Sequence, residues 1–346
     1  MMVGMRDVAK KAGVSVSTVS LVVNGTGYVS EDMRKRVEKA MKALDYIPNE
    51  LARNLYHDRT NIIGVIVPTI RHPFFATLAA LLQQELANKG FRTMLCSTTD
   101  SLNGEAEYVD MLRRHMMDGI IMAAHTAHAP DYWSSIGRPV VAFDRYLGAG
   151  IPSLGSDHEQ GGNLVADLLI RSGTRHVVMV SGPRSQFHDL EGEGTTFPTI
   201  RYYAALEERM EREGVKYDYI EAGEVNDMRG YAHAMHDIFD RFDDVDAVVS
   251  SDIGAAYCVQ EAHRRGVSVP DELQVVAYDG TYLADTAGKR LTAICQDFNA
   301  IAELTVRRMV EAMEGKQTAS MQMSHTGELD DLVPVRLMLG ETTKQQ

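Results

Sequence analysis

Near the N-terminus, hydrophobic residues recur at the spacing of a short helix. Segment 16–24 lies between Ser15, a good helix N-cap, and Asn24-Gly25, which tolerate the left-handed conformation that ends helices. The apolar face of this segment consists of Val19, Val22 and Val23. Segment 6–12, closed by Gly13, is typical of a preceding helix. Together they predict either a helix-turn-helix, whose second helix enters the DNA major groove, or a plain helical hairpin with a serine-rich face.

A third helix is predicted over residues 30–44, because Ser30 is a suitable cap and apolar residues follow at helical spacing. The residues expected on its buried side are Met33, Val37, Ala40, Met41 and Leu44. Off this stripe we expect a solvated basic face of Lys35, Arg36, Lys39 and Lys42. After Pro48, residues 49–55 predict a helix of about two turns, which is marginal in water on its own. It is a candidate for folding only when docked to DNA and to its twin in a dimer.

From Ile62 onward, short apolar runs alternate with helical patterns, which is typical of α/β proteins with parallel sheets. Strands are predicted over 62–67, 93–97, 119–123, 140–143, 177–181, 217–221, 247–251, 273–278, 291–295 and 331–339. Helices are predicted over 75–89, 105–116, 160–172, 201–213, 229–242, 254–265 and 300–314. Two groups of such units, with a return after Leu291, predict two doubly wound lobes and a cleft between them. Ligands in such folds bind beyond the carboxyl ends of the strands.

Charge is distributed unevenly along the 346 residues. Taken alone, the net charge of −13 argues against binding to nucleic acid. However, residues 1–59 hold ten Lys/Arg and seven Asp/Glu, a net +3, which leaves −16 on the remainder. A basic module on an acidic body can bind phosphates locally. The cysteines lie far apart in apolar segments and indicate buried, reduced thiols: Cys96, Cys258 and Cys295.

Six stretches of the first 55 residues occur in a specific order and spacing. They are Asp7-Val8-Ala9, Ala12-Gly13-Val14-Ser15, Thr18-Val19-Ser20, Val22-Val23-Asn24, Tyr46-Ile47-Pro48-Asn49 and Ala52-Arg53-Asn54-Leu55. In this order they resemble the headpiece and hinge helix of the LacI/GalR family of bacterial repressors. The remainder resembles that family's two-lobed, periplasmic-binding-protein-like core. A further stretch, Phe143–Leu147 with Ile151-Pro152, resembles sucrose-utilisation repressors of this family.

The resemblance implies three domains and their roles. A helix-turn-helix headpiece would span residues 1–48, a hinge helix and linker 49–60, and a two-lobed effector-binding and dimerisation domain 61–346. The implied function is a repressor that binds pseudo-palindromic operator DNA under the control of a small sugar effector. The heptad tail with which the lac repressor forms tetramers is missing, so we expect a homodimer.

The resemblance also implies which residues contact DNA from the second helix. Val16, Ser17 and Leu21 occupy base-facing positions, and the residues that contact the backbone or orient the helix are Thr18, Ser20 and Asn24. Most relatives have arginine at the position of Leu21. Arginine can donate two hydrogen bonds to guanine, whereas leucine offers only apolar contact, so the operator sequence should differ from the common one. The alternative is that Leu21 is a core residue.

In the hinge, Leu55 matches a leucine that wedges into a base step from the minor groove and bends the duplex. Ala52 would allow close approach, and Tyr46 and Asn49 would lie at the hinge entrance. Alternatively, Leu51 and Leu55 pack the hinge helix on the body.

For the cleft, Phe74 and Phe75 resemble a ligand-stacking pair, and the alternative is a core role for one of them. Charged groups that end predicted strands suit a hydroxyl-rich ligand, since carboxylates accept and arginine donates hydrogen bonds: Asp144, Arg145 and Asp279. Asp279 matches the family's sugar-binding aspartate, and Gln296 matches a residue near the lobe crossover. Arg201 can reach the cleft, although the family's arginine position is occupied here by Pro198. Helix capping or a bridge between the lobes is the alternative role of these residues.

Enzyme motifs are missing from the sequence. There is no Walker loop, no GxGxxG after a strand, and no acid–base pair with a phosphate site, so we expect no catalysis and no cofactor. The pairs His125/His128 and His233/His236 lack a nearby third ligand, so we expect no metal. A solute-binding transport component and a sugar enzyme fused to a DNA-binding module are the competing interpretations. The absence of a signal peptide and of an 18-residue apolar run predicts a cytoplasmic protein without membrane contact.

Overall fold

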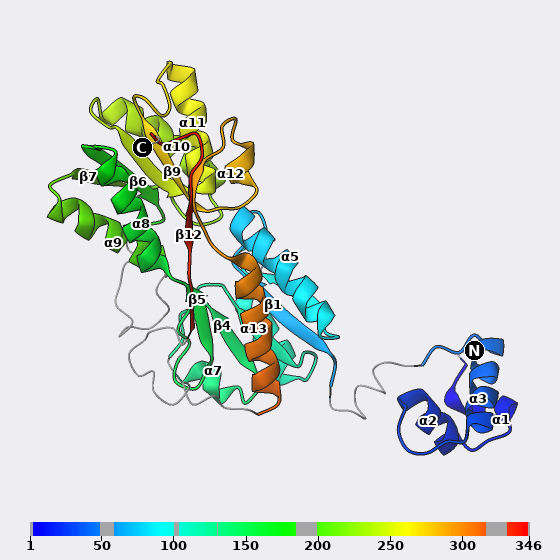
Figure 1. Ribbon diagram of the computed structural model, residues 1–346. Coiled ribbons are helices and arrows are strands. Elements are labelled where there is room, and N and C mark those ends of the chain that lie inside the picture. Colours follow the sequence, from blue (N-terminus) through cyan, green and yellow to red (C-terminus); the bar gives the residue numbers. More distant parts are fainter. Residues whose placement is uncertain are drawn as a thin grey trace. The chain divides into compact units, whose positions relative to one another are not determined.

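The chain folds into two units, Met1–Thr60 and Asn61–Gln346, each described here by itself. The computed structural model (Figure 1) describes residues 3–48, 59–99, 104–129, 131–184, 199–315 and 331–344. The predicted hinge helix over 49–55 therefore lies outside the described residues, and the predicted boundaries at 48 and 60 remain predictions. No helix in the described ranges is long and apolar enough to cross a membrane.

The first unit is a small three-helix core, as the apolar spacing predicts. Its helices are α1 (Met5–Ala12), α2 (Val16–Asn24) and α3 (Glu31–Ala43). The Ser15 hydroxyl caps α2 by accepting from the backbone N–H of Thr18 at 3.0 Å. Gly25 ends α2 in the left-handed conformation, with φ of 66°. One fully buried valine from each helix forms the centre of the core: Val8, Val19 and Val37.

One prediction about α3 is wrong, and one is incomplete. Met33 is 37% exposed, because it lies in the first turn, beyond the reach of the other two helices. Arg36 is not simply a solvated basic residue. Its guanidinium donates hydrogen bonds to the carbonyl oxygens of Ala12 at 2.7 Å and Gly13 at 3.0 Å. These carbonyls end α1 and have no partner within the helix, so a cation at this place also complements the helix dipole.

The second unit contains two six-stranded sheets, one in each of two lobes. The strands of the first lobe are β1 (Ile62–Val67), β2 (Arg92–Ser97), β3 (Gly119–Met122), β4 (Val140–Phe143), β5 (Ser153–Ser156) and β11 (Asp331–Val333). The strands of the second lobe are β6 (His176–Ser181), β7 (Lys216–Glu221), β8 (Ala247–Ser251), β9 (Gln274–Asp279), β10 (Thr292–Cys295) and β12 (Arg336–Met338). The spatial orders are β11-β5-β4-β3-β1-β2 and β12-β10-β9-β8-β6-β7. All pairs are parallel except β12 with β10.

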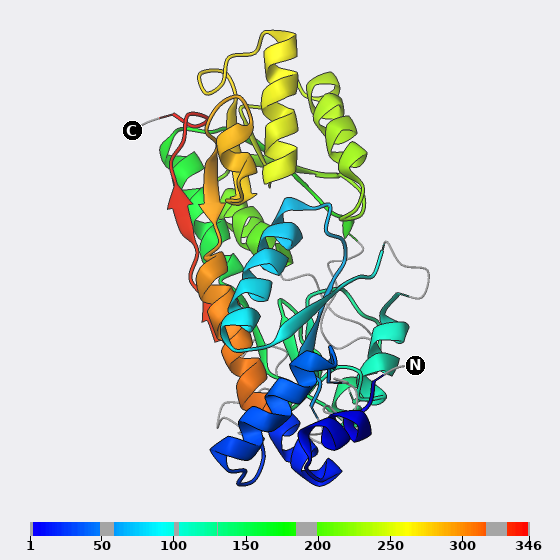
Figure 2. The same ribbon diagram turned by 90° about the vertical axis from the view of Figure 1, so that its right-hand side faces the viewer.

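Helices cover both faces of each sheet, as the doubly wound prediction requires (Figures 1 and 2). The first lobe contains α5 (Pro73–Asn88), α6 (Gly104–Arg113), α7 (Tyr132–Ser135) and α13 (Phe298–Met313). The second lobe contains α8 (His158–Arg171), α9 (Thr199–Arg212), α10 (Met228–Arg241), α11 (Asp252–Arg265) and α12 (Leu283–Thr286). In the first lobe, α5 and α13 lie side by side over one face. The near-continuous burial of the strands follows from this double cover.

The chain crosses between the lobes three times: from β5 to α8, from β10 to α13, and from β11 to β12. The sequence predicted only the return after Leu291. The single predicted strand 331–339 is wrong, because its two halves belong to different sheets. The strand β5 was not predicted, because Ser153-Leu154-Gly155-Ser156 has turn-like composition and a single large apolar residue. The one-turn helices α7 and α12 were also missed, since they are too short to show the helical spacing of apolar residues.

We expect Arg36→Met to destabilise α1 locally, by about 1 kcal/mol, because two carbonyls lose a charged donor that is itself half exposed. The methionine retains the apolar stem, so packing changes little. Amide hydrogen exchange of α1 in the full chain measures the effect. Lys39→Met, at an exposed position on the same helix, is the matched control. Equal exchange in both variants would show that the Arg36 contacts contribute nothing to stability.

Candidate functional site

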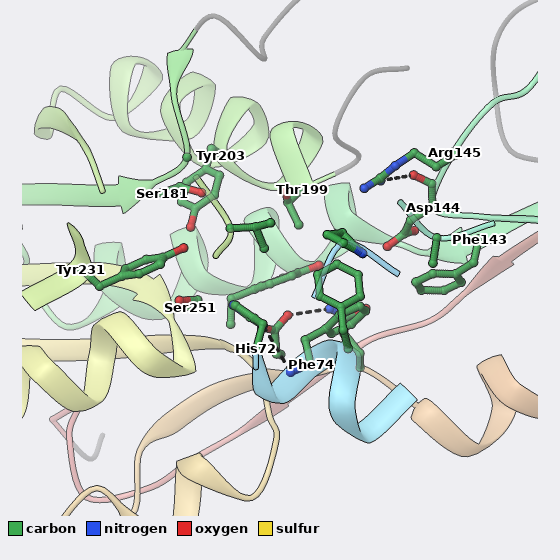
Figure 3. Close-up of a pocket in the computed structure, with 18 of the residues that line it drawn as sticks. His72, Phe74, Phe143, Asp144, Arg145, Ser181, Thr199, Tyr203, Tyr231 and Ser251 are labelled. Atoms are coloured by element: carbon green, nitrogen blue, oxygen red, sulfur yellow. Dashed lines mark hydrogen bonds between the residues drawn. The ribbon is translucent and has the colours of Figure 1, made fainter. Parts of the chain in front are cut away.

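A cavity of about 120 Å³ lies between the lobes, at the carboxyl ends of strands from both sheets. Figure 3 shows its lining. The first lobe contributes an aromatic wall and three polar residues that follow strands or cap a helix: His72, Asp144 and Arg145. The second lobe contributes hydroxyl groups and one carboxyl: Ser181, Thr199, Tyr203, Tyr231, Ser251 and Asp279. The place of the cavity is the one expected for ligands of doubly wound sheets.

The aromatic wall is built around Phe74 at the start of α5. Its ring stacks on Phe143 with centroids 6.0 Å apart and planes at 24°, and contacts Phe75 edge-on at 5.0 Å. Phe298 of α13 lies 5.4 Å from it on the other side. The ring is therefore held by neighbours from three elements and is 6% exposed. Such a wall provides a rigid apolar surface against the face of a ligand.

Six of the seven residues predicted for the cleft line this cavity: Phe74, Phe75, Asp144, Arg145, Asp279 and Gln296. The seventh, Arg201, is exposed and does not line it. The reason is helical phase. Because α9 begins at Thr199, the cavity is reached by Thr199 and by Tyr203, four residues later on the same side. Arg201 lies two residues from each and therefore on another side of the helix.

Sequence reasoning missed several lining residues. Ser181 and Ser251 end β6 and β8, so the rule that identified Asp279 at the end of β9 should also have found them. Tyr203 and Tyr231 belong to helices, and nothing in their spacing distinguishes a cavity-facing tyrosine from a core one. Val225, in a loop of the second lobe, packs against the core of the first.

Two carboxyl groups, one from each lobe, are buried at the cavity. Asp144 follows β4 with φ of 50°, and Asp279 ends β9 with φ of 116°, conformations uncommon outside glycine. Both are only 6% exposed. Burial raises the pKa of Asp279 well above its usual value, and the nearby carboxyl of Asp252 raises it further. Burial also raises the pKa of Asp252 to about 6, although the backbone and hydroxyl of Thr281 donate to its carboxyl.

Hydrogen bonds link these carboxyls across the lobe crossings. Ser156, at the end of β5, donates from its hydroxyl to Gln296 at 2.6 Å, and Gln296 donates to Asp279 at 2.8 Å. The Ser156 backbone N–H also donates to Asp144, at 3.3 Å. Gln296, which precedes α13, therefore serves both as a lining residue and as a bridge between the lobes. The bridge that was predicted as the alternative role of Gln296 is thus present, and its role in effector binding stays a prediction.

His72 caps α5 and faces the cavity. Its Nδ1 accepts from the backbone N–H of Phe74 at 3.3 Å, and its ring lies edge-on to Phe75. Burial lowers the pKa of His72 to about 4, so the imidazole is neutral at physiological pH. With Nδ1 accepting, the proton resides on Nε2, which makes this nitrogen a donor.

In the first unit, the exposed side of α2 carries two of the predicted base-facing residues. Val16 is 43% exposed and Ser17 is exposed. Leu21 is half-buried and lies near Gly27, in the turn that follows the helix. The remaining predicted contacts are half-buried: Thr18, Ser20, Asn24 and Tyr46. Asn49, Ala52 and Leu55 lie outside the described residues.

The side chains beside the exposed face of α2 are oriented by local hydrogen bonds. The Thr18 hydroxyl lies 2.9 Å from that of Ser15, and the Asn24 amide donates to the Ser20 hydroxyl at 3.1 Å. Tyr46 packs on the three-helix core. A helix-turn-helix unit joined to a two-lobed body with a ligand cavity is the architecture of ligand-controlled transcriptional regulators.

The chain belongs to the lacI family of bacterial regulatory proteins. Residues 4–49 match "Bacterial regulatory proteins, lacI family" and residues 166–330 match "Periplasmic binding protein-like domain". It is 30% identical over 344 residues to the ribose operon repressor of Halalkalibacterium halodurans, covering 99% of this chain and 98% of that one. It is 31% identical over 343 residues to the sucrose operon repressor of Streptococcus mutans, covering 99% and 100%. The protein is thus a transcriptional repressor of this family rather than an enzyme.

The fold agrees with solved structures of the family. The lac repressor dimer bound to operator and the anti-inducer ONPF matches with a TM-score of 0.80 at 23% identity, covering 99% of each chain. A complex of the regulator CelR with cellobiose matches with a TM-score of 0.67 at 24% identity, covering 98% and 99%. Within the described part of the chain, no three His, Cys, Asp or Glu side chains are placed to hold a metal ion.

The lowered pKa of His72 makes stability depend on pH. Because an unfolded histidine titrates near 6.5, the unfolded chain binds more protons than the folded one between pH 6.5 and about 4, and stability falls as pH falls through this window. We expect the wild type to lose about 2–3 kcal/mol more than His72→Gln between pH 7 and pH 4.5.

Urea unfolding followed by the fluorescence of Trp133, the single tryptophan and a buried residue of the same lobe, measures this loss. His233→Gln, at an exposed histidine of α10, should behave like the wild type. An equal loss in the wild type and His72→Gln would mean that His72 becomes protonated without unfolding.

Proposed function

We propose that this protein is a homodimeric repressor whose affinity for pseudo-palindromic operator DNA is controlled by a small sugar or sugar derivative bound between the lobes. The headpiece over residues 1–48 reads the DNA, the segment 49–60 is the hinge, and residues 61–346 bind effector and partner subunit. The observation that carries the proposal is the cavity, in which an aromatic wall faces buried carboxyls from both lobes.

The chemistry of the cavity suits a ligand with an apolar face and several hydroxyl groups. A sugar ring presents C–H groups on one face, which pack on Phe74, and hydroxyls at its edge. Carboxyl groups accept from such hydroxyls, while the guanidinium of Arg145 and the Nε2 of His72 donate to them. Among described lining residues Arg145 is the sole arginine or lysine, and it lies beside Asp144, so the cavity favours an uncharged ligand over a phosphorylated one.

The relatives' names provide the first compounds to test. Relatives are named ribose and sucrose operon repressors, and solved structures of similar fold contain cellobiose or D-xylulofuranose. A thermal-shift screen of the full chain against these sugars and their phosphates tests the proposal, because a ligand at 100 times its dissociation constant adds about 2.7 kcal/mol of stability. Absence of any shift across a broad sugar panel would contradict it.

The positive charge of the first unit and the exposed face of α2 support binding to DNA. The net +3 of residues 1–59 is confined to a small unit, whereas the rest of the chain carries −16 and repels phosphate. The exposed face of α2 carries Val16 and Ser17, and these side chains are small enough to let the helix approach base edges closely. We place the protein in the cytoplasm, where such DNA is found.

The hinge provides the connection between ligand and DNA. A helix over residues 49–55 is too short to be stable alone, so its order must come from DNA and from the hinge of the partner subunit. An effector that changes the arrangement of the lobes would change the spacing of the two hinges in a dimer. The hinges would then pair less well, Leu55 would leave its base step, and operator affinity would fall. If the ligand is a corepressor, its binding would instead improve the pairing of the hinges and raise operator affinity.

We expect Asp279→Asn to weaken binding of any sugar that stabilises the wild type by at least about tenfold, since an amide replaces the carboxyl and changes which of its two positions can donate and accept hydrogen bonds. Isothermal titration calorimetry measures this affinity. Asp271→Asn, at an exposed position of the same lobe, should bind sugar normally. Unchanged sugar affinity in Asp279→Asn would show that the role of Asp279 is structural.

We expect Leu21→Arg to change which operator is preferred. If Leu21 faces the groove, the arginine should favour guanine at one symmetric pair of positions, by roughly 1–3 kcal/mol per bidentate contact. Selection from a randomised operator library compares the two proteins, with Lys42→Arg as a control that adds no groove contact. Identical preferred sequences for wild type and Leu21→Arg would show that residue 21 does not read bases.

A further inference from the structure

One buried histidine outside the cavity lining contacts groups of both lobes. His158 is the first residue of α8, directly after the crossing from β5, and only 2% of its surface is exposed. Its Nε2 lies 3.0 Å from the Asp144 carboxylate of the first lobe. Its Nδ1 is hydrogen-bonded to the Tyr278 hydroxyl of the second lobe. Both of these partners line the cavity, whereas His158 does not.

The backbone around His158 fixes the position of its ring. Asp157 caps α8 by accepting from the backbone N–H of Gln160 at 2.9 Å, and its own N–H donates to the Val333 carbonyl. Gln160 in turn accepts from the backbone N–H of Val335, in the third crossing. The first turn of α8 is therefore attached to the crossing from β11 to β12. The imidazole projects from a site where two crossings meet.

The chemistry of the three groups determines the direction of the hydrogen bonds. A carboxylate only accepts, so His158 Nε2 carries the proton that is donated to Asp144. In a neutral imidazole Nδ1 is then an acceptor, and Tyr278 donates its O–H to it. Burial raises the pKa of Tyr278 well above its usual value, so this phenol keeps the proton that the bridge needs. Each of the three groups in the chain Tyr278–His158–Asp144 thus has a hydrogen-bond partner within the protein.

We propose that His158 is a positioning residue: its bridge between Tyr278 and Asp144 holds the two lobes in the arrangement seen here and orients the Asp144 carboxylate towards the cavity. The second bridge, Ser156–Gln296–Asp279, ends on the other cavity carboxyl. A group that engages either carboxyl therefore acts on a link between the lobes. A change in the angle between the lobes must separate His158 from Asp144, because His158 and Tyr278 belong to the second lobe and Asp144 belongs to the first.

The proposal is independent of which ligand the cavity binds, so it can be tested on the free protein. Nitroxide labels at Gln84→Cys on α5 and Glu211→Cys on α9 would report the distance between the lobes, and both positions are exposed. The native thiols should remain unlabelled, because they are buried and burial raises the pKa values of Cys96 to about 12 and of Cys295 to about 11. The pKa of Cys258 is raised as well, again by burial. Pulsed electron resonance then measures the distance distribution in the full chain.

We expect one narrow distance distribution in the wild type. His158→Leu, which removes both hydrogen bonds at similar volume, should add a second population of about ten per cent, the upper end of the range for a minor state. His158→Gln, which retains a donor and an acceptor, should restore much of the single distribution. His233→Leu, the same substitution at an exposed histidine of α10, should leave the distribution unchanged.

A purely structural role for His158 would lower the melting temperature without a second distance, and this result would overturn the proposal. A broad distribution in the wild type would also overturn it, since the bridge would not then hold the lobes. If His158→Leu does not fold, Asp144→Gly removes the first-lobe partner of the same bridge at a φ of 50°, which glycine tolerates, and should produce the second population by itself. Failure of every sugar to bind would contradict the proposed function and would leave this result unaffected.

Discussion

Burial of two carboxyl groups between the lobes is the constraint on which the rest of the body depends. An uncompensated carboxylate in a protein interior is costly, so each must be surrounded by donors. The donors to Asp144 come from the first turn of α8 and from β5, and the donor to Asp279 comes from Gln296. Each donor lies at or next to a place where the chain crosses between lobes. Satisfying the carboxyls and joining the lobes are therefore one structural requirement.

This arrangement suits a protein that must change state when a ligand binds. A ligand alters an equilibrium only by its difference in affinity for the two states. Here the groups that a hydroxyl-rich ligand would contact, Asp144 and Asp279, are the same groups that end the bridges between the lobes. On the proposed function, ligand binding and lobe arrangement therefore act on the same two carboxyl groups. A difference in affinity between arrangements is then expected.

Much of this structure could be predicted from the sequence. The predictions succeeded where apolar residues recur at regular spacing and where a charged residue ends a predicted strand. The spacing of Val19 and Val22 predicted α2, and the strand-end rule located Asp144 and Asp279 beside the cavity. The failures have physical causes. Arg201 was placed in the cleft because helical phase cannot be fixed until the first residue of α9 is known. β5 is stabilised by its neighbours β4 and β11 rather than by its own composition, and the partners of His158 come from residues far away in the sequence.

On the proposed function, occupancy of the cavity between the lobes changes the affinity of the protein for operator DNA. Fluorescence anisotropy on an operator selected by the full-length protein tests it most directly, with a sugar whose binding calorimetry has established. We expect saturating sugar to change the operator dissociation constant at least about tenfold, or 1.4 kcal/mol, in either direction. An operator affinity that is the same with and without saturating sugar would contradict the account.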